Sequence, residues 1–371
     1  MFRKLRAEAE RENGKENKLM FDNRALFALL LPIIIEQILN SFMGMVDTVM
    51  VSNVGSAAIS AVSLVDSINN LVIQVFSAMA AGAAIVCSRF IGAKDRNGCN
   101  RAARQVVLTV FIISVAIMVF GLIFRVPLLQ VVFGAIEPEV MENAMIYFLI
   151  TVVSYPFLAL FNAGAAFFRA ESNAKLPMFV AAGTNVLNIA GNAVFIFGMN
   201  MGVAGAACAT LIARCIELIL VLGYVYGKKL ALACGPRGMF GWSKSFVFRF
   251  VETSAPVIAN EFMWGLGTTM YSLAYGRMGD DAVAAITIAT TIQDIAVVLF
   301  QGLSAATAVI LGHELGAGHI KQAEKYATQF FILQFLVTVT ADILLVLGRW
   351  KIIGMATNAP ATAPTASDSV T

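Results

Sequence analysis

The chain has 371 residues, of which 59% are hydrophobic and 13% are charged, and its mean hydropathy is +0.79. Soluble domains carry about 25% charged residues, so this composition excludes an ordinary soluble protein and indicates a polytopic membrane protein. The net charge of +3 gives no reason to expect a nucleic acid as partner, and the lipid bilayer is the expected surrounding. Five cysteines without a CxxC pair and two histidines without a neighbouring acidic cluster predict no metal site of their own.

The first 24 residues are basic and polar, and they lack the short apolar core and cleavage site of a signal peptide. We interpret them as a cytoplasmic leader. Nine apolar segments of spanning length follow, since a span needs about 20 residues. They cover residues 26–50, 58–86, 103–125, 140–162, 176–197, 203–226, 250–275, 282–311 and 327–348. Each is predicted to be a helix, because a lone spanning segment in lipid must satisfy its own backbone hydrogen bonds. The expected fold is therefore an all-α polytopic membrane protein.

The charges of the connections alternate along the chain. Basic residues cluster in the leader and in the connections after the second, fourth, sixth and eighth segments, as with Arg89, Lys94 and Arg96. The connection after the third segment instead carries Glu137 and Glu139. The positive-inside rule then places the N-terminus and the even-numbered connections in the cytoplasm. We expect a multi-pass protein of the inner or plasma membrane of the cell.

An internal repeat relates the two halves of the chain without a gap. A shift of 224 residues places Pro32 on Pro256 and Arg125 on Arg349. Because six helices separate the copies, both keep the same orientation, which is the parallel-repeat architecture of transporters. The predicted parts are a leader (1–24), a lobe of six transmembrane helices (25–227), a cytoplasmic inter-lobe loop (228–247), a partial second lobe of three helices (248–358) and a disordered tail (359–371).

The second copy of the repeat stops early. It runs to about Asn358 and gives way to APATAPTASDSVT, a stretch without an apolar span that is typical of disorder. Three helices that the symmetry predicts are missing from this sequence. We therefore expect a C-terminally truncated second lobe, and a further chain that supplies the missing helices is one candidate partner.

A polar stripe runs along the otherwise apolar helix predicted over 26–50. Gln37, Asn40 and Asp47 lie three or four residues apart or at multiples of that spacing, and so share one face. A carboxylate inside a membrane is costly unless it faces a wet or polar interior, so Asp47 indicates a functional site. The alternative is a structural polar contact between packed helices.

Neutral oxygen donors occur in two later segments. Asn188 and Asn192 are one helical turn apart, and Thr210 lies in the next span. One carboxylate with several neutral oxygens is the ligand set of a Na⁺ or proton site, and the sequence alone does not show that these side chains converge. Beyond such a Na⁺, no metal is predicted.

The second half carries a different set of polar residues. Glu261 and Asp294 predict a second acidic locus that attracts a cation, or one of them is a neutral packing carboxyl. Tyr271 stands at the repeat position of Asp47, so the two halves are not chemically equivalent. The candidates for lining a cavity are Gln37, Asn40, Asn70, Glu261, Tyr271 and Asp294. No GK[ST] phosphate loop and no nucleophile–base set occurs in the sequence, so we expect neither an enzyme nor a cofactor.

Several stretches together resemble the multidrug and toxic compound extrusion (MATE) family. They are LPIIIEQILNSFMGMVDTVMVSNVG, SRFIGAKDRNGCNRAARQ, RAESNAKLPM, TNVLNIAGNAVFIFGMNMGVAGAACATLIAR and LGAGHIKQAEKYATQ. The resemblance covers residues 20 to 358. It implies twelve helices in two lobes, a V-shaped central cavity, and export of organic cations driven by entry of H⁺ or Na⁺.

The resemblance also implies roles for particular residues. Asp47 matches the aspartate of the family's cation site, Asn188 and Asn192 match two residues of the fifth helix, and Thr210 matches a threonine of the sixth. Some members have aspartate where this chain has Asn192, which leaves one carboxylate in this set and the choice between Na⁺ and H⁺ open. Glu261 lies earlier in its helix than the family's seventh-helix glutamate, and is the weaker match.

The expected function is a secondary active antiporter that exports organic cations or drugs in exchange for H⁺ or Na⁺. Two alternatives stay open from the sequence. One is a non-transporting fragment of such a transporter, and the other is a lipid-linked sugar flippase of the wider superfamily. A flippase favours a strongly cationic cavity, whereas the spans here hold few basic residues.

Overall fold

A computed structural model describes residues 23–133, 137–228, 244–276, 297 and 300–357. Most of the predicted leader and inter-lobe loop, the predicted tail and Asp294 lie outside the described residues. The regular elements of the described residues are helices, and they contain no strand. The all-α prediction is therefore confirmed.

Eight of the nine predicted segments overlap described helices, whereas most of the predicted segment 282–311 lies outside the described residues. The helices are α2 (Asn23–Ser52), α3 (Ser56–Gly92), α4 (Arg96–Ile123), α5 (Arg125–Phe133), α6 (Pro138–Val153), α7 (Tyr155–Ala170), α8 (Lys175–Asn192), the π-helix η1 (Ala193–Gly198), α9 (Gly202–Gly227), α11 (Lys244–Gly276) and α13 (Ile320–Thr357). Residues 300–316 are also helical. The short helix α5, which follows the third span, was not predicted.

Five described helices are long and apolar enough to cross a membrane, or six if α6 and α7 count as one bent span. These correspond to the six segments predicted for the first lobe. Helices α11 and α13 are not among them, so their role as spans stays a prediction.

The predicted single helix over 140–162 is wrong in one respect, because the chain bends there. Helices α6 and α7 meet at Ser154 with an angle of 43°. Pro156 is the second residue of α7 and has no backbone N–H, so the carbonyl of Val152 loses its intrahelical partner. This break places the Ser154 side chain, which is fully buried, inside the bundle.

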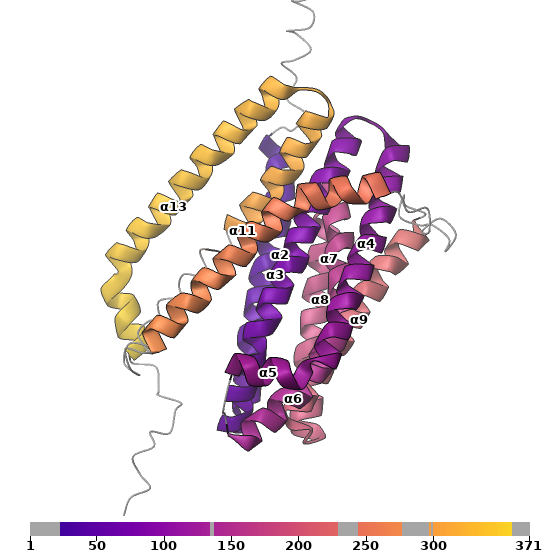
Figure 1. The fold of residues 1–371 in the computed structure, drawn as a ribbon. Helices are drawn as coiled ribbons and strands as arrows, with labels where there is room; N and C mark the ends of the chain where they lie inside the picture. Colours follow the sequence, from indigo (N-terminus) through magenta and orange to yellow (C-terminus); the bar gives the residue numbers. More distant parts are fainter. Residues whose placement is uncertain (1–22, 134–136, 229–243, 277–296, 298–299, 358–371) are drawn as a thin grey trace, which may run out of the picture.

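Helix α3 lies at the centre of the arrangement. It packs against α4, α6, α7 and α11, while α2 packs on α8 and α8 on α9. Figure 1 shows α11 crossing the bundle obliquely and α13 at its outer edge. The core between α3 and α7 is aromatic, with the rings of Phe76 and Tyr155 edge to face and their centroids 6.0 Å apart.

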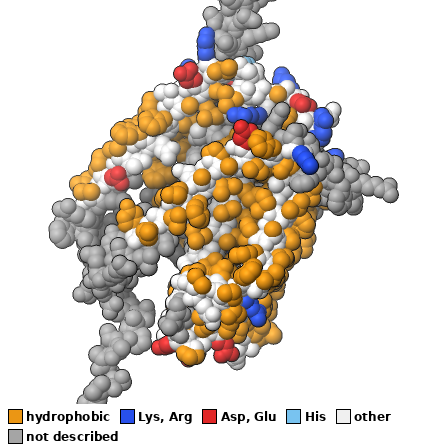
Figure 2. All heavy atoms as spheres, in the orientation of Figure 1, with side chains coloured by type: hydrophobic (Ala, Val, Ile, Leu, Met, Phe, Trp, Pro, Cys, Tyr) orange, Lys and Arg blue, Asp and Glu red, His pale blue; other side chains and the backbone are white. Residues whose placement is uncertain are grey.

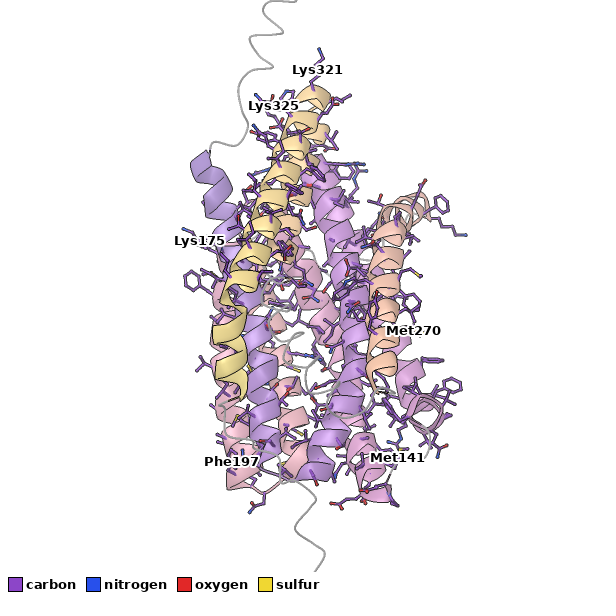
Figure 3. The ribbon with its side chains drawn as sticks, turned by 90° about the vertical axis from the view of Figure 1, so that its left-hand side faces the viewer. Met141, Lys175, Phe197, Met270, Lys321 and Lys325 are labelled. Carbon is purple, nitrogen blue, oxygen red and sulfur yellow. The ribbon has the colours of Figure 1, made fainter. Side chains whose placement is uncertain are left out.

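The surface of the molecule is apolar along most of its length. Figure 2 shows hydrophobic side chains over much of the visible face and most Lys and Arg side chains toward its upper end. On α4, Phe111, Phe120 and Ile123 are exposed. In Figure 3, Lys321 and Lys325 lie at the upper end, whereas Phe197 and Met141 lie at the lower end. An apolar band with a basic end is the surface expected of a bilayer-spanning protein.

The two repeats meet at this basic end through glycines. A Cβ at Gly92 would overlap the backbone carbonyl of His313, and one at Gly316 would overlap that of Arg89. The 224-residue shift pairs Gly92 with Gly316 and Arg89 with His313, so the two contacts are reciprocal. The third close contact joins Ser88 to its own counterpart, Gly312. The repeats are therefore related here by a pseudo-twofold axis that passes between Ser88 and Gly312.

Candidate functional site

The four residues proposed for a cation site converge in one hydrogen-bonded chain. Nδ2 of Asn192 donates to Oδ1 of Asp47 over 2.5 Å and to Oδ1 of Asn188 over 2.9 Å. Nδ2 of Asn188 in turn donates to Oγ1 of Thr210 over 3.2 Å. The chain thus connects α2, α8 and α9, whose residues are far apart in the sequence.

One face of α8 carries the polar side chains that make this network. Thr184, Asn188 and Asn192 are spaced by four residues, so they lie above one another on the same face. All three are buried. Thr184 donates to Oε1 of Glu217 on α9 over 2.9 Å, so each residue of the series has a polar partner on a neighbouring helix.

The amide of Asn192 is held in one orientation. Its nitrogen faces two acceptors, and a flipped amide would place its oxygen against the Asp47 carboxylate. The Asn192 side chain is fully buried, and its Oδ1 has no hydrogen-bond partner among the described residues. An unpaired buried carbonyl oxygen is costly, and a bound cation would satisfy it.

Close helix packing brings α8 and α9 together at the site. A Cβ added at Gly191 would lie 3.1 Å from Cβ of Ala209, and one at Gly205 would lie 3.0 Å from the backbone of Phe195. The chain changes from α-helix to the π-helix η1 directly after Asn192. Such π-turns recur at functional sites. The sequence analysis did not predict the π-turn.

A second carboxylate lies near this network, and the sequence analysis missed it. Asp66 is in the first third of α3, and its Oδ1 accepts from Tyr147 over 3.3 Å and from Asn69 over 3.1 Å. Its signal was present in the sequence, because Asp66 interrupts an apolar span as Asp47 does.

A buried ion pair lies near the middle of α2. Nη2 of Arg169 lies 2.6 Å from Oε1 of Glu36, and the Glu36 side chain is only 2% exposed. The structure thus gives Glu36 a structural partner on α7. Arg214 on α9 donates to Oγ of Ser154 at the break between α6 and α7.

The cavity-lining candidates lie apart from the Asp47 chain of hydrogen bonds. Asn40, Asn70 and Tyr271 are exposed, and Gln37 and Glu261 are partly buried. No hydrogen bond among the described residues joins any of them to Asp47. Their role in a cavity stays a prediction. Within the described part of the chain, no group of His, Cys, Asp and Glu residues could hold a metal through three such ligands.

Comparison with known proteins gives a family match in two pieces. The MatE family profile matches residues 32–194 and residues 256–370. The matches begin at Pro32 and Pro256, the prolines that the internal repeat pairs and that lie inside α2 and α11.

Relatives and solved structures agree with this match. The chain is 28% identical over 348 residues to the uncharacterized transporter YisQ of Bacillus subtilis, covering 92% of this chain and 76% of that protein. It is 25% identical over 342 residues to the probable multidrug resistance protein NorM of Thermotoga maritima, covering 91% and 73%. A MOP superfamily transporter from Pyrococcus furiosus has the same fold, with a TM-score of 0.82 at 21% identity over 91% of this chain and 74% of that one.

An outward-facing structure of a multidrug resistance MATE family transporter is equally similar in fold, with a TM-score of 0.82 at 21% identity over 90% of this chain and 74% of that one. The resemblance stated from the sequence motifs is thus confirmed. Because the family profile matches well over half of its residues, this chain belongs to the MatE family, whose members are membrane transporters and not enzymes.

Proposed function

We propose that this protein is a secondary active antiporter that exports small organic cations in exchange for H⁺ or Na⁺. The observation that carries this proposal is the chain from Asp47 through Asn192 and Asn188 to Thr210, in which the buried Asn192 amide has an unpaired oxygen. A carboxylate surrounded by neutral oxygens is suited to a hard monovalent cation or a proton. Names such as multidrug resistance protein NorM among the relatives support the export of drugs.

The same contacts suggest how ion binding changes the protein. In the described state the Asn192 amide links α8 to α2 through Asp47. A cation or proton that takes the carboxylate competes with this link and so changes how the two helices pack. Occupancy of the site then biases the protein between two arrangements of its lobes, which is the alternating access of repeat-built transporters.

The proposal includes the orientation of the protein in the membrane and a role for each of its two lobes. The N-terminus and the basic end face the cytoplasm of a cell whose plasma or inner membrane holds the protein. Residues 25–227 form the ion-binding lobe, and residues 248–358 contribute the opposing surface. Gln37, Asn40, Asn70, Glu261, Tyr271 and Asp294 line the substrate cavity between them.

A transport assay with the protein held in vesicles tests this function. We expect a fluorescent organic cation such as ethidium to be transported by vesicles that hold the chain, at a rate that depends on an imposed Na⁺ or pH gradient. Asp47→Asn keeps the shape of the side chain and removes its charge, so gradient-driven transport should fall to the level of empty vesicles.

Asp342→Asn in α13 provides a matched control, because Asp342 is exposed and lies outside the site. At equal protein abundance, this variant should transport the fluorescent cation at the same rate as the unchanged protein. Normal transport by Asp47→Asn would remove Asp47 from the mechanism. Transport by the unchanged chain that ignores both gradients, or no transport at all, would overturn the antiport proposal.

A further inference from the structure

Two buried cysteines meet at the basic end of the molecule. Cys87 lies near the end of α3 and Cys99 near the start of α4. The Cys99 thiol donates to the backbone oxygen of Cys87, with 3.9 Å between Sγ and that oxygen. Both residues belong to one small apolar cluster, and the two thiols also form a hydrogen bond with each other. The two sulfur atoms are therefore neighbours, and both are free thiols in the described structure.

The turn between the two helices sets this contact. α3 ends at Gly92 and α4 begins at Arg96. The Asp95 carboxylate caps α4 by accepting from the backbone N–H of Gly98 over 2.8 Å. Because the turn is short and capped, the end of α3 packs against the start of α4. The fold itself thus brings the two cysteines together, and no movement of the helices is needed.

The alternative is that both residues only fill space. A buried free cysteine usually acts as a small hydrophobic residue, and the cluster around this pair consists of Ala103, Phe167 and Ala170. A pair differs from a single buried cysteine, because each sulfur has a reaction partner within reach. A disulfide bond is about 2.0 Å long, so two sulfur atoms in contact can form it by rotating their side chains.

The two sulfur atoms have different surroundings. Cys99 is in the first turn of α4, where its backbone N–H donates to the carbonyl of Asp95. The N-terminus of a helix stabilises negative charge and so favours the thiolate, which is the reactive form. The hydrogen bond from the Cys87 thiol supports this charge, and the nearby carboxylates of Asp95 and Glu171 oppose it. Cys99 is also the more exposed of the two, at 4% against 1% for Cys87. An oxidant should therefore attack Cys99 first.

We propose that Cys87 and Cys99 are an oxidisable dithiol, which closes to a disulfide when hydrogen peroxide reaches it. This inference is independent of the proposed function. The Cys99 thiolate attacks one peroxide oxygen, the O–O bond breaks, and the released hydroxide takes up the proton that Cys99 lost. The Cys87 sulfur then attacks the sulfenic acid on Cys99, so that the S–S bond forms and the S–O bond breaks. The leaving hydroxide takes the Cys87 proton. Two thiols thus lose two electrons, and one peroxide becomes two water molecules.

The disulfide would act next to the contact between the two repeats. Ser88 follows Cys87 directly, and its Oγ would overlap a Cβ added at Gly312 of the second repeat. A bond from Cys87 to Cys99 ties this end of α3 to α4 within the first repeat. Oxidation therefore restrains one side of the contact between the repeats, while the reduced pair leaves it free to move.

Peptide mapping of the purified full chain tests the pairing. Trypsin cuts between the two cysteines, for example after Arg89, so a disulfide links two separate peptides. After peroxide treatment and digestion without a reductant, we expect a species that joins the Cys87 and Cys99 peptides and is lost with dithiothreitol. Cys208 and Cys215 serve as the internal control. They lie seven residues apart on α9, about 10 Å along one helix, and should form no link with each other.

Single substitutions assign a role to each sulfur. In Cys87→Ser, the sulfenic acid on Cys99 has no thiol to react with. Its labelling by dimedone, which traps sulfenic acids, should be several-fold higher than in the unchanged protein. Cys99→Ser should leave little dimedone on Cys87. Cys208→Ser is the matched control and should form the link as the unchanged protein does. If a variant does not fold, mapping of the unchanged protein still decides the pairing.

Thermal unfolding tests whether the bond ties the helix ends. The linked protein should unfold at a higher temperature than the reduced protein, because a disulfide restricts the unfolded chain. Dithiothreitol should reverse the rise, and peroxide should cause no rise in Cys87→Ser. A lower unfolding temperature in the linked protein would show that the bond distorts the fold, and it would contradict the tie.

The other outcomes are equally decisive. No linked peptide after peroxide treatment, or oxidation of Cys99 to a sulfinic acid without a link, would show that the pair only fills space. Equal dimedone labelling of the two single variants would contradict Cys99 as the sulfur that is attacked first. None of these measurements involves transport, so a failure here leaves the antiport proposal standing, and a failure of antiport leaves this inference untouched.

Discussion

Glu36 and Arg169 are the most deeply buried oppositely charged pair among the described residues. Their contact of 2.6 Å joins α2 to α7, and only 2% of Glu36 and 13% of Arg169 is exposed. One further atom of each, Oε2 of Glu36 and Nε of Arg169, has no hydrogen-bond partner among the described residues. The pair is therefore held chiefly by one strong bond, and it depends on both charges being present.

Glu36→Gln should destabilise the folded protein by about 3–5 kcal/mol, because Arg169 would be left as an uncompensated buried charge. The free energy of unfolding in detergent micelles, measured by denaturant titration, gives this value. Arg169→Gln serves as the reciprocal change, and the double variant should lose less than the sum of the two single losses. A loss under about 0.5 kcal/mol for Glu36→Gln would place the pair with exposed, weakly coupled ion pairs.

The spacing of polar residues in single helices predicted most of the Asp47 network. Asn188 and Asn192 were found from their four-residue spacing, and Asp47 from its apolar surroundings. The pairing of Glu36 with Arg169 could not be found this way, because the two residues are 133 positions apart. Nothing in either local sequence says which helix will lie opposite.

The element that positions the site is the pair of helices α8 and α9 with η1 between them. Gly191 and Gly205 allow α8, η1 and α9 to approach so closely that a Cβ at Gly205 would lie 3.0 Å from the backbone of Phe195. This approach puts Thr210 within hydrogen-bond distance of Asn188. Small residues at helix contacts are the usual device for such packing in membranes.

Gly205→Leu should therefore weaken the fold by about 1–3 kcal/mol, because a larger side chain overpacks the contact with Phe195 and moves α9 outward. The free energy of unfolding measures this effect. Gly183→Leu in α8 makes the same chemical change where a Cβ meets no atom within 4 Å, and it should be nearly neutral. Equal losses in the two variants would mean that close packing at Gly205 does not hold the pair of helices together.

Periodicity predicted that these elements exist but not how they are bent. The break at Ser154 and the π-turn after Asn192 both lie inside segments that read as continuous apolar helices. Pro156 was a local signal for the first, and it was passed over. The π-turn has no such signal in the sequence, because it depends on how η1 packs on α9.

At the scale of the whole molecule, the reciprocal glycine contacts join the two repeats. Gly92 and Gly316 each face the backbone of the other repeat, and Ser88 is fully buried against Gly312. The basic ends of both repeats therefore meet with almost no space between their backbones. A substitution at one of these glycines therefore changes how the two repeats pack against each other, and not the structure of either repeat alone.

Gly316→Ala should move the two repeats apart at their basic ends. The added Cβ would overlap the carbonyl of Arg89, and the overlap can be relieved only if one of the two backbones shifts. Ser88→Cys, in a background without the five native cysteines, reports the opening through labelling by a water-soluble maleimide. Labelling should be slow in Ser88→Cys alone and several-fold faster with Gly316→Ala. Gly267→Ala, where a Cβ meets no atom within 4 Å, is the matched control. Equal labelling in all three proteins would contradict the role of the glycines as the junction.

By itself the sequence determined that the chain is an all-helical membrane protein, that its halves are related by a shift of 224 residues, and that Asp47 lies in an apolar helix with an amide pair further on. These features are local or periodic, and hydropathy and spacing report such features directly. Only the tertiary structure determined which residues from different helices are in contact. It joined Asp47 to Asn192, Glu36 to Arg169 and Gly316 to Arg89. Such partners depend on which helix faces meet, and that is determined by packing across the bundle and not by any one segment.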